Sequence, residues 1–339
     1  MEGNRLVSRM MANKKGMMAL DQIVIVIVLV ATFAIILFFY GLFMWNPTID
    51  KAACHQSVVL RGSLNAGIFE AGKKIIPLKC ETEKICLTMG GVCDEFGKAS
   101  KTNKVTTVKL SKDKSKAQEK VRETIANALF DCHSMLGEGK INFMSQPLTQ
   151  TKYCLICSRF ALDSQAKAIV DDLSYIDLYS YMKTKKTSGG NSYLKFTYDV
   201  ERVDGMFEIL EKARELYNEN NEKNPSGDFI SEVGDLKIDM QTENAIISQI
   251  VPDSTWDKWG VSAVAGTAVA AGVILAPFTV GSSLTLTGVG IAVLAGTTTT
   301  GIMIVKQFPD GARYFHPSVY SYNVEALRDL KCNSFEAAP

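Results

Sequence analysis

The stretch that decides the fold is NKKGMMALDQIVIVIVLV, residues Asn13 to Val30, where two lysines, a glycine and an acid precede an apolar run. The run continues to Trp45, and residues 23–45 contain no charged side chain. At a rise of about 1.5 Å per residue, such a helix spans the roughly 30 Å hydrocarbon core of a bilayer. A secretory signal peptide has a shorter core and a small-residue cleavage site, which Leu42 to Asn46 does not offer. The pattern therefore predicts a transmembrane helix over residues 23–45.

Charges on either side of this span set its orientation. Four basic residues precede it, whereas only Lys51 follows it closely. The four are Arg5, Arg9, Lys14 and Lys15. Because basic flanks stay in the cytoplasm, residues 1–22 are expected to form a cytoplasmic tail. We therefore expect a cell-membrane protein whose N-terminus is cytoplasmic and whose bulk is extracytoplasmic.

A shorter motif lies inside the same stretch. Lys14 and Lys15 are followed by Gly16 and Met17, and Asp21 stands just before the apolar run. This segment, and no other part of the chain, resembles the class III signal of archaeal type IV pilin-like proteins. The resemblance implies cleavage after Gly16, so that Met17 begins the mature chain. It also implies that Asp21, at a position where glutamate is commoner in the family, helps to align subunits. An ordinary uncleaved anchor is the alternative.

Composition divides the rest of the chain. The 339 residues carry a net charge of +1, so no global field favours nucleic acid, and we expect no such partner. Hydrophobic residues make up 47% of the chain, and their excess lies in residues 23–45 and 259–305. The region between these stretches has the composition of a soluble domain. We therefore predict an extracytoplasmic domain over residues 46–258 and an extracytoplasmic C-terminal segment over residues 306–339.

All eight cysteines follow the first span. They are Cys54, Cys80, Cys86, Cys93, Cys132, Cys154, Cys157 and Cys332. An even number on an exported side is typical of a disulfide framework, because oxidation persists outside the cytosol. Eight cysteines allow 105 pairings, so the connectivity stays open.

Two other readings of the cysteines compete with structural disulfides. Cys154 and Cys157 form a C-x-x-C motif, which a thiol oxidoreductase would use, but the residues around it are typical of a strand. Cys132, His133, Cys154 and Cys157 could together bind zinc, although a single C-x-x-C is a weak zinc signal. Structural disulfides are favoured, and we predict no metal and no cofactor.

Catalytic signals are sparse elsewhere, and we therefore expect a protein that is not an enzyme. The sequence contains neither a Gly-x-Ser-x-Gly elbow nor a His-Glu-x-x-His motif. Only three histidines are present, His55, His133 and His316, and two of them adjoin cysteines. The carboxylates Asp171, Asp172, Asp253 and Asp257 are expected on the surface, where solvation and helix capping explain them better than acid–base catalysis.

The exported region mixes helical and strand patterns. A helix begins near Ser115, and Gly137 supplies the left-handed residue that ends it. Its apolar stripe consists of Ala117, Val121, Ile125, Ala128, Leu129 and Cys132. Two more helices are expected over Ser164–Met182 and Asp204–Asn220. Strands are expected over Lys152–Asp163, Tyr193–Val200 and Asp235–Val251, with short strands and loops over residues 47–95. The mixture predicts an α+β domain.

The second apolar stretch, residues 259–305, also lacks charged side chains. Turn residues at its centre, 276–283, suggest two short membrane helices in a hairpin. Small residues recur along it and would allow close helix packing. They are Gly260, Ala268, Gly272, Gly288, Ala292 and Gly296. Buried strands within the exported fold are the alternative for this segment.

These patterns together predict a membrane-anchored structural or assembly protein of the cell envelope. Its fold class is α+β, with a transmembrane helix, a disulfide-stabilised domain and a Gly/Ala-rich helical hairpin near the C-terminus. Its expected partners are the lipid bilayer, further copies of itself and other envelope proteins. A membrane-perturbing protein acting through residues 259–305 and a thiol-disulfide oxidoreductase are the two alternatives.

Overall fold

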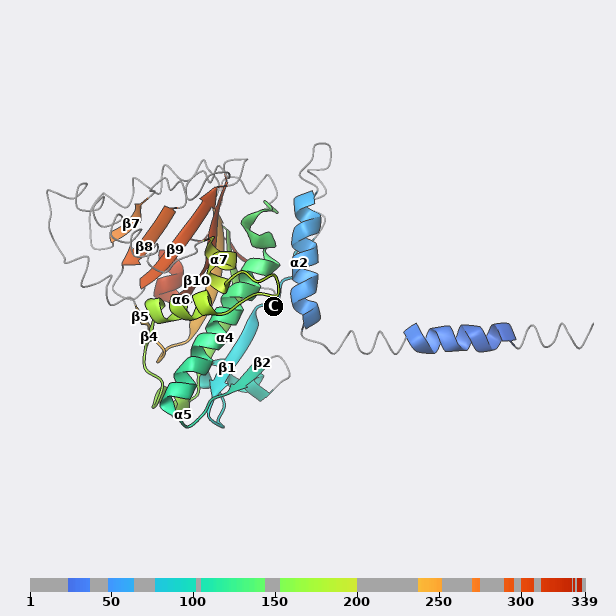
Figure 1. Cartoon of the computed structure of the whole chain (residues 1–339), viewed down its shortest axis with the longest axis horizontal. Coiled ribbons are helices and arrows are strands. Elements are labelled where there is room, and N and C mark those ends of the chain that lie inside the picture. The colour runs from blue at the N-terminus through green and yellow to red at the C-terminus, as the bar shows by residue number, and fades with distance from the viewer. Residues whose placement is uncertain are drawn as a thin grey trace, which may run out of the picture. The chain divides into compact units, whose positions relative to one another are not determined.

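The computed structural model describes the chain in several ranges and divides it into two units, Met1–Ile49 and Asp50–Pro339 (Figure 1). The described ranges are residues 24–36, 48–63, 77–101, 105–143, 153–199, 237–251, 270–274, 290–295, 300–307, 312–330, 332 and 334–336. The predicted processing residues Gly16, Met17 and Asp21 lie outside these ranges, as does the predicted helix Asp204–Asn220.

In the first unit, residues 24–36 form a helix, which agrees with the helical character predicted for residues 23–45. Its large apolar side chains are exposed, among them Leu29 at 62% and Phe33 at 62%. Residues 37–45 lie outside the described part. Within the part of the chain that the structure describes, no helix is both long enough and apolar enough to cross a membrane.

The second unit is built on a nine-stranded mixed sheet in the order β2-β1-β3-β6-β10-β9-β8-β7. Strands β1 (Glu83–Thr88), β2 (Val105–Lys109) and β3 (Tyr153–Leu162) are parallel, with β1 in the middle. The remaining neighbours in this order pair antiparallel. They are β6 (Asn244–Val251), β7 (Ala270–Ile274), β8 (Gly290–Ala295), β9 (Thr300–Gln307) and β10 (Arg313–Ser321). A short strand, β11 (Ser334–Glu336), pairs parallel with the start of β3.

One face of the sheet is covered by α4 (Lys114–Met135), which connects β2 to β3 (Figure 1). Asp113 caps this helix by accepting a hydrogen bond from the Lys116 amide, 3.0 Å away. The predicted apolar stripe is buried against the sheet, and Gly137 has a φ of 72° just after the helix. The prediction for this helix is therefore confirmed. Two shorter helices, α6 (Tyr175–Thr184) and α7 (Tyr193–Tyr198), pack beside it.

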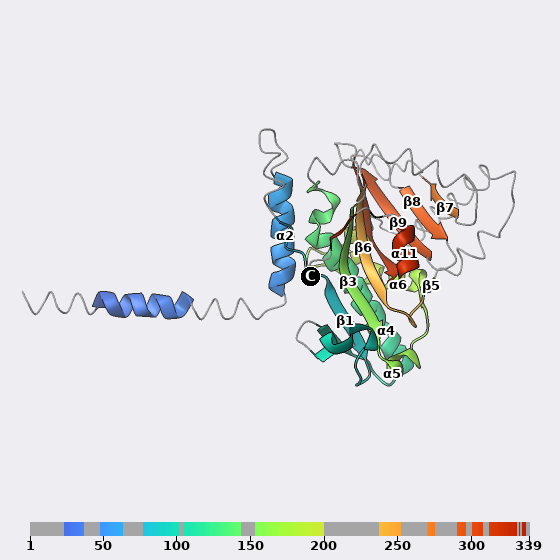
Figure 2. The same cartoon turned by 180° about the vertical axis from the view of Figure 1, so that it is seen from behind.

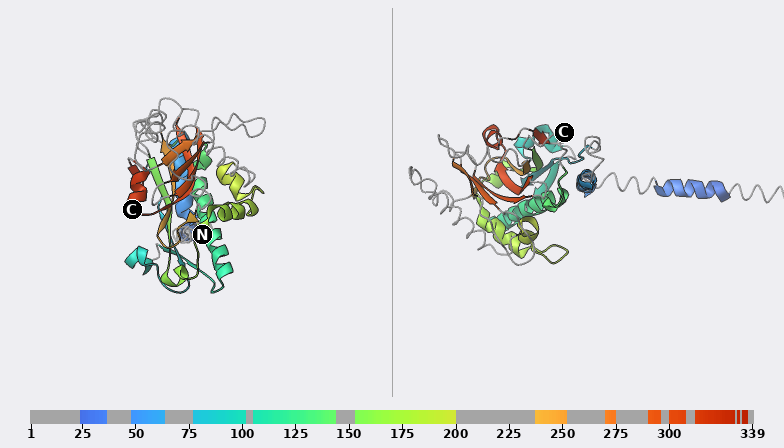
Figure 3. Two further views of the ribbon diagram at one scale, coloured as in Figure 1. Left: turned by 90° about the vertical axis from the view of Figure 1, so that its left-hand side faces the viewer. Right: turned by 90° about the horizontal axis from the view of Figure 1, so that it is seen from above.

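The opposite face is covered by shorter elements. The 3-10 segment η1 (Asp94–Lys101) contributes Phe96, which packs with the Cys86–Cys93 pair and Ala161. The helix α11 (Val324–Asp329) covers Phe315 and Ile247 through its own apolar residues and Leu330. Figures 2 and 3 show α11 on the face of the sheet opposite α4.

The predicted helix Ser164–Met182 is wrong as a single element. It is divided into α5 (Ser164–Lys167), the short strand β4 (Leu173–Ser174) and α6. β4 pairs with β5 (Lys237–Ile238), and Ser174 caps α6 by accepting a hydrogen bond from the Ile176 amide. Short polar side chains that bond the backbone favour such helix ends over helix continuation.

Two predicted strand regions are helical instead. Tyr193–Val200 was expected as a strand, but Ser192 caps the helix α7 there and Asp199 ends it with a φ of 59°. Residues 57–63, within the region expected to hold strands and loops, belong to α2 (Thr48–Ser63). By contrast, the strands expected over Lys152–Asp163 and Asp235–Val251 are confirmed as β3, β5 and β6.

The predicted helical hairpin over residues 259–305 is wrong for its described residues. These residues form β7 and β8 and begin β9, and the three strands pair antiparallel within the main sheet. Gly272 therefore pairs with Val293 in a sheet register, and Ala292 pairs with Val273. The β-branched and Thr-rich character of the stretch favours strands, which was the alternative interpretation. Gly260, Ala268, Gly288 and Gly296 lie outside the described ranges.

Candidate functional site

All eight cysteines form disulfides, as the sequence predicts. The pairs are Cys54–Cys80, Cys86–Cys93, Cys132–Cys157 and Cys154–Cys332. The first pins α2 to the segment before β1, and the second closes the loop after β1. The third joins α4 to β3, and the fourth ties the C-terminal segment to the start of β3. The framework therefore connects both faces of the sheet to its central strands.

The C-x-x-C motif does not form a dithiol. Cys157 packs with Leu155 and Leu129 on the α4 side of the sheet, whereas Cys154 packs with Ile156 on the opposite side. Residues three apart in a strand point to opposite faces, so each cysteine finds a different partner. The sulfur atoms that the redox interpretation requires are thus held in two separate disulfides.

The zinc interpretation is also overturned by this pairing. Cys132 and Cys157 are bonded to one another, and His133 turns its Nδ1 toward the Tyr314 hydroxyl at 3.3 Å. Among the residues that the structure describes, no group of three or more His, Cys, Asp or Glu side chains could hold a metal ion.

The most concentrated polar site lies where β1 and β3 end. Asp163 follows β3 directly, and its side chain is buried at 1% exposure. One carboxylate oxygen, Oδ2, accepts hydrogen bonds from the Thr88 hydroxyl at 2.6 Å, the Gly91 amide at 2.9 Å and the Met89 amide at 3.2 Å. The other, Oδ1, accepts from the Ala166 amide at 2.7 Å and so caps α5. We call this arrangement the Asp163 clamp.

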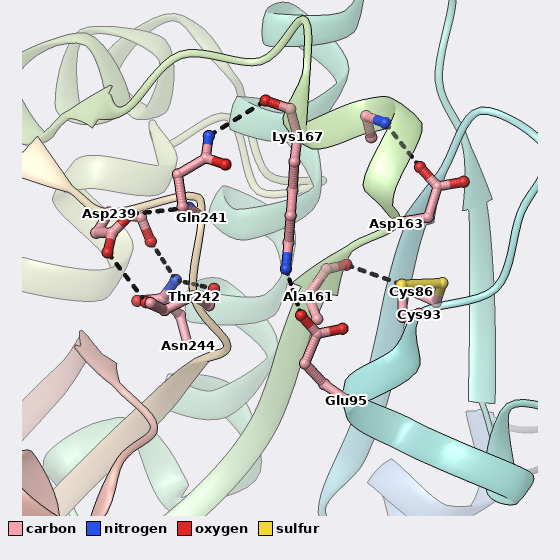
Figure 4. A network of polar contacts seen from close by, with 11 residues as sticks. Cys86, Cys93, Glu95, Ala161, Asp163, Lys167, Asp239, Gln241, Thr242 and Asn244 are labelled. Carbon is pink, nitrogen blue, oxygen red and sulfur yellow. Dashed lines mark hydrogen bonds and ion pairs between the residues drawn. A yellow bond between two sulfur atoms is a disulfide. The ribbon is translucent and has the colours of Figure 1, made fainter.

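The clamp leaves little room in the loop that it holds. A side-chain carbon added at Gly91 would lie 2.7 Å from Asp163 Oδ2, and Gly90 has a φ of 138°, which favours glycine. The Cys86–Cys93 disulfide closes the same loop, and its Cys93 sulfur lies 3.3 Å from the Ala161 carbonyl oxygen (Figure 4). Two glycines, a disulfide and a buried carboxylate thus fix one short loop.

Electrostatics at the clamp favour the ionised carboxylate. Burial opposes ionisation of Asp163, but the hydrogen bonds from Thr88, Ala166, Gly91 and Met89 outweigh it and lower its pKa. Four donors occupy most of the lone-pair sites of a carboxylate. The Asp163 carboxylate therefore has a structural role in this arrangement, because its oxygens accept hydrogen bonds from groups of the protein itself.

Further polar contacts extend the Asp163 clamp to the turn between β5 and β6 (Figure 4). Lys167 on α5 forms an ion pair with Glu95 of η1, and the Gln241 side-chain amide donates to the Lys167 carbonyl oxygen at 3.2 Å. Within the turn, Asn244 donates to the Asp239 carbonyl oxygen at 2.7 Å. The segment after β1, the helix α5 and the β5–β6 turn are thereby joined.

A second buried cluster joins α4, α7 and β10. The rings of His133 and His316 stack with centroids 5.1 Å apart, at 2% and 4% exposure. His316 Nδ1 lies 2.5 Å from the Thr197 carbonyl oxygen, and the Tyr198 hydroxyl donates to the Pro317 carbonyl oxygen at 2.9 Å. Burial raises the pKa of Tyr198 and Tyr314, so both phenols stay neutral. We call this arrangement the His–Tyr cluster.

An arginine holds the opposite face together. Arg159 of β3 forms an ion pair with Glu243, through both its Nε and its Nη2 atoms. Its guanidinium carbon lies 4.1 Å from the Tyr322 ring centroid and 5.7 Å from that of Phe96. A planar guanidinium suits stacking between aromatic rings while it pairs with a carboxylate. Arg159 therefore links η1 to the segment that leads into α11.

The remaining titratable candidates have surface or capping roles where the structure describes them. Asp171 pairs with Lys114 at 2.8 Å, and the hydrogen bond from Lys114 lowers its pKa. Asp172 accepts a hydrogen bond from the Met240 amide at 3.3 Å, and His55 Nδ1 lies 2.9 Å from the Ser134 carbonyl oxygen. Asp253 and Asp257 lie outside the described ranges.

Sequence reasoning found the disulfides but missed both the Asp163 clamp and the His–Tyr cluster. A signal for the clamp was present, because Asp163 precedes a helix start and the loop after β1 carries two adjacent glycines. The stacking of His133 on His316 had no such signal, because these residues lie far apart in the sequence and no motif links them. Compared with family models, curated proteins and solved structures, the chain matches none of them.

Proposed function

We propose that this chain is a membrane-anchored, extracytoplasmic structural or assembly protein of the cell envelope, with a pilin-like N-terminal signal. The observation that carries the proposal is the complete pairing of eight cysteines in one body. Disulfides of this density persist in oxidising compartments and are rare in the cytosol. Their pairing supports export of the region that follows the apolar run.

The first unit supports the anchor. Residues 24–36 are helical and expose their apolar side chains, including Leu29 and Phe33. Exposure of an apolar surface to water is unfavourable, and a helix that is apolar all round exposes such a surface. Insertion into a bilayer would remove that surface from water. The uncharged run 23–45 has a length of about 34 Å as a helix, which matches the hydrocarbon core.

The body supports a structural role. Its polar clusters act as locks between elements: the Asp163 clamp joins two strand ends to α5, and the His–Tyr cluster joins α4 to β10. A body held by disulfides and internal hydrogen bonds keeps its surface shape in the extracellular medium. Such a body suits assembly with further copies or with other envelope proteins, and its near-zero net charge gives no basis for nucleic acid as a partner.

The N-terminal signal supplies the test. The intact mass of the protein purified from membranes should correspond to a chain that begins at Met17. Replacing Gly16 with leucine should abolish processing, because the signals that this segment resembles are cut by a membrane peptidase after a small residue, whereas Gly3→Leu in the same tail should leave processing unchanged. An uncleaved wild-type chain would reject the pilin-like signal, and release of the protein by carbonate washing would reject the anchor.

A further inference from the structure

Two of the three histidines in the chain meet inside the body, in the His–Tyr cluster. His133 comes from α4 and His316 from β10, and their rings lie 18° from parallel with centroids 5.1 Å apart. His316 lies where the pairing of β10 with β6 shifts its register, between Phe315 and Ser318. Such an irregularity re-aims a side chain out of the regular strand alternation. Histidine is the side chain whose charge ordinarily changes between pH 5 and 8, and two of them share one buried position.

The groups that the neighbouring elements turn toward this pair are neutral. Tyr198 of α7 and Tyr314 of β10 lie with their ring centroids 6.0 Å and 5.2 Å from that of His316. Burial raises the pKa of both phenols, so neither carries a negative charge near neutral pH. On α4, Cys132 precedes His133 and does not titrate, because it is held in a disulfide.

The charged residues that lie close to the pair in sequence do not offset a positive charge on it. Asp131 is two residues before His133, so it lies on the opposite side of α4, where it forms an ion pair with α2. Asp199 is exposed at the end of α7, and Lys195 and Arg313 are cationic. A proton on either imidazole would be a buried charge, and protons on both would place like charges about 5 Å apart. The folded arrangement therefore favours two neutral rings.

Three hydrogen bonds attach α6 and α7 to one short stretch of β10. They join Thr197 to His316 at 2.5 Å, Tyr198 to Pro317 at 2.9 Å and Tyr175 to Val319 at 2.7 Å. Residues 158–331 contain no cysteine, so α6 and α7 carry no disulfide. By contrast, α4 is bonded to β3 through Cys132 and Cys157. Loss of the contacts with β10 would therefore release α6 and α7 while α4 stays on the sheet.

We propose that the His133–His316 pair is an acid-sensitive latch, which holds α6 and α7 on β10 while both imidazoles are neutral and releases them in acid. Departure of α7 takes Phe196 away from His133 and the Thr197 carbonyl oxygen away from His316, so water reaches both rings. The latch belongs to the body alone and does not depend on the membrane anchor.

The size of the effect follows from proton linkage. A solvated imidazole has a pKa of about 6.5, so the open form takes up two protons that the closed form excludes. The form that binds more protons gains population as the pH falls. The opening constant, which is the ratio of open to closed molecules, should therefore rise about 100-fold between pH 7.5 and 5.5.

The test is amide hydrogen exchange of the full chain, with its disulfides intact, measured by mass spectrometry at pH 7.5 and 5.5. After correction for the intrinsic pH dependence of exchange, peptides from α6 and α7 should show the rise of about 100-fold in the opening constant. Peptides from α4 and β3 should keep their protection. His133→Phe keeps an aromatic ring but removes one titrating group, so it should reduce the rise to about tenfold.

His55→Phe is the matched control, because His55 is the third histidine and lies outside the pair, with its Nδ1 2.9 Å from the Ser134 carbonyl oxygen. It should leave the rise at about 100-fold. Equal opening constants of the wild-type α6 and α7 at the two pH values overturn the proposal, and this measurement needs no variant. Equal effects of the two substitutions also overturn it. So does a parallel loss of protection in α4 and β3, which would mean global unfolding in acid.

Discussion

Replacement of Asp163 with asparagine tests the clamp with little change in size. The side chain is buried at 1% exposure, so its packing is preserved while its charge is lost. The new NH2 group must face either the three donors of the loop after β1 or the single Ala166 amide of α5. The second orientation is less unfavourable, because it leaves only the Ala166 amide without an acceptor.

The expected loss of stability follows from these contacts. Loss of the N-cap bond to Ala166 costs about 1 kcal/mol. The three remaining bonds change from charge-assisted to neutral, which removes roughly 0.5–1 kcal/mol each. We therefore expect Asp163→Asn to lower the free energy of unfolding by about 3 kcal/mol, a large share of the roughly 5–15 kcal/mol typical of a domain. Asp163→Ala should cost more, because it leaves the Met89, Gly91 and Ala166 amides without an acceptor, whereas the Thr88 hydroxyl can still donate to the Gly91 carbonyl oxygen at 2.9 Å.

Urea unfolding followed by circular dichroism, with disulfides intact, measures this change as a shift of the midpoint at constant slope. The control is Asp171→Asn, because Asp171 is an exposed carboxylate paired with Lys114 on the surface. We expect no measurable shift for the control. Equal midpoints for Asp163→Asn and the control would refute the reasoning that the clamp stabilises the fold.

The difference in free energy of unfolding between wild type and Asp163→Asn should depend on pH, which gives a second check on the role of the Asp163 charge. The pKa of Asp163 is lowered in the folded state from the ordinary value of 3.8, so its contribution is fully present above that value. The contribution is lost as the pH falls through the folded-state pKa. The gap between wild type and Asp163→Asn should therefore be constant near neutral pH and narrow below about pH 4. A gap that did not narrow in acid would exclude the charge as its source.

Three further comparisons between variants test the fold by the same assay. Gly91→Ala should destabilise by about 1–3 kcal/mol because its methyl group would meet the clamp carboxylate, whereas Gly189→Ala, with its nearest neighbour 3.7 Å away, should be tolerated. Gly139→Ala should lower the free energy of unfolding at least as much as Gly91→Ala. Its methyl group would lie 2.6 Å from the Tyr314 ring, and the φ of +57° at Gly139 strains any residue with a side chain. Serine replacement of the Cys154–Cys332 pair, 178 residues apart, should lower the free energy of unfolding by about 5 kcal/mol. The same replacement of Cys86–Cys93, 7 residues apart, should lower it by about 2 kcal/mol, because the disulfide closes a shorter loop in the unfolded chain. Equal losses would contradict this chain-entropy origin.

The strand pattern of residues 152–163 says more about the roles of Cys154 and Cys157 than the C-x-x-C motif that they form. Once this segment is read as a strand, its period of two places Cys154 and Cys157 on opposite faces. A dithiol or a shared metal site at these two positions is then disfavoured by strand geometry alone. The pairing with Cys132 on one face and Cys332 on the other follows from long-range packing, which the spacing of residues could not provide.

The helices show where local patterns were sufficient and where they were not. The α4 stripe was predictable because it extends over several turns between a capping Asp113 and a terminating Gly137. The six residues of α7 were not recognised, although Leu194, Thr197 and Tyr198 are buried at helical spacing and Ser192 precedes them as a cap. In so short a segment, β-branched and aromatic residues favour a strand by propensity, and tertiary packing decided against it.

The distribution of locks bears on where function lies in this molecule. In the described body, Asp163, Arg159 and the cysteines of four disulfides direct their bonding capacity inward, and all of them except the Cys86–Cys93 pair join segments that are well separated in sequence. Bonding of this kind makes the body rigid, and rigidity lowers the conformational cost of any contact that its surface makes. α2 is held on the body in the same way by Lys51 and Cys54. At these sites the bonding capacity of the side chains therefore serves the stability of the fold.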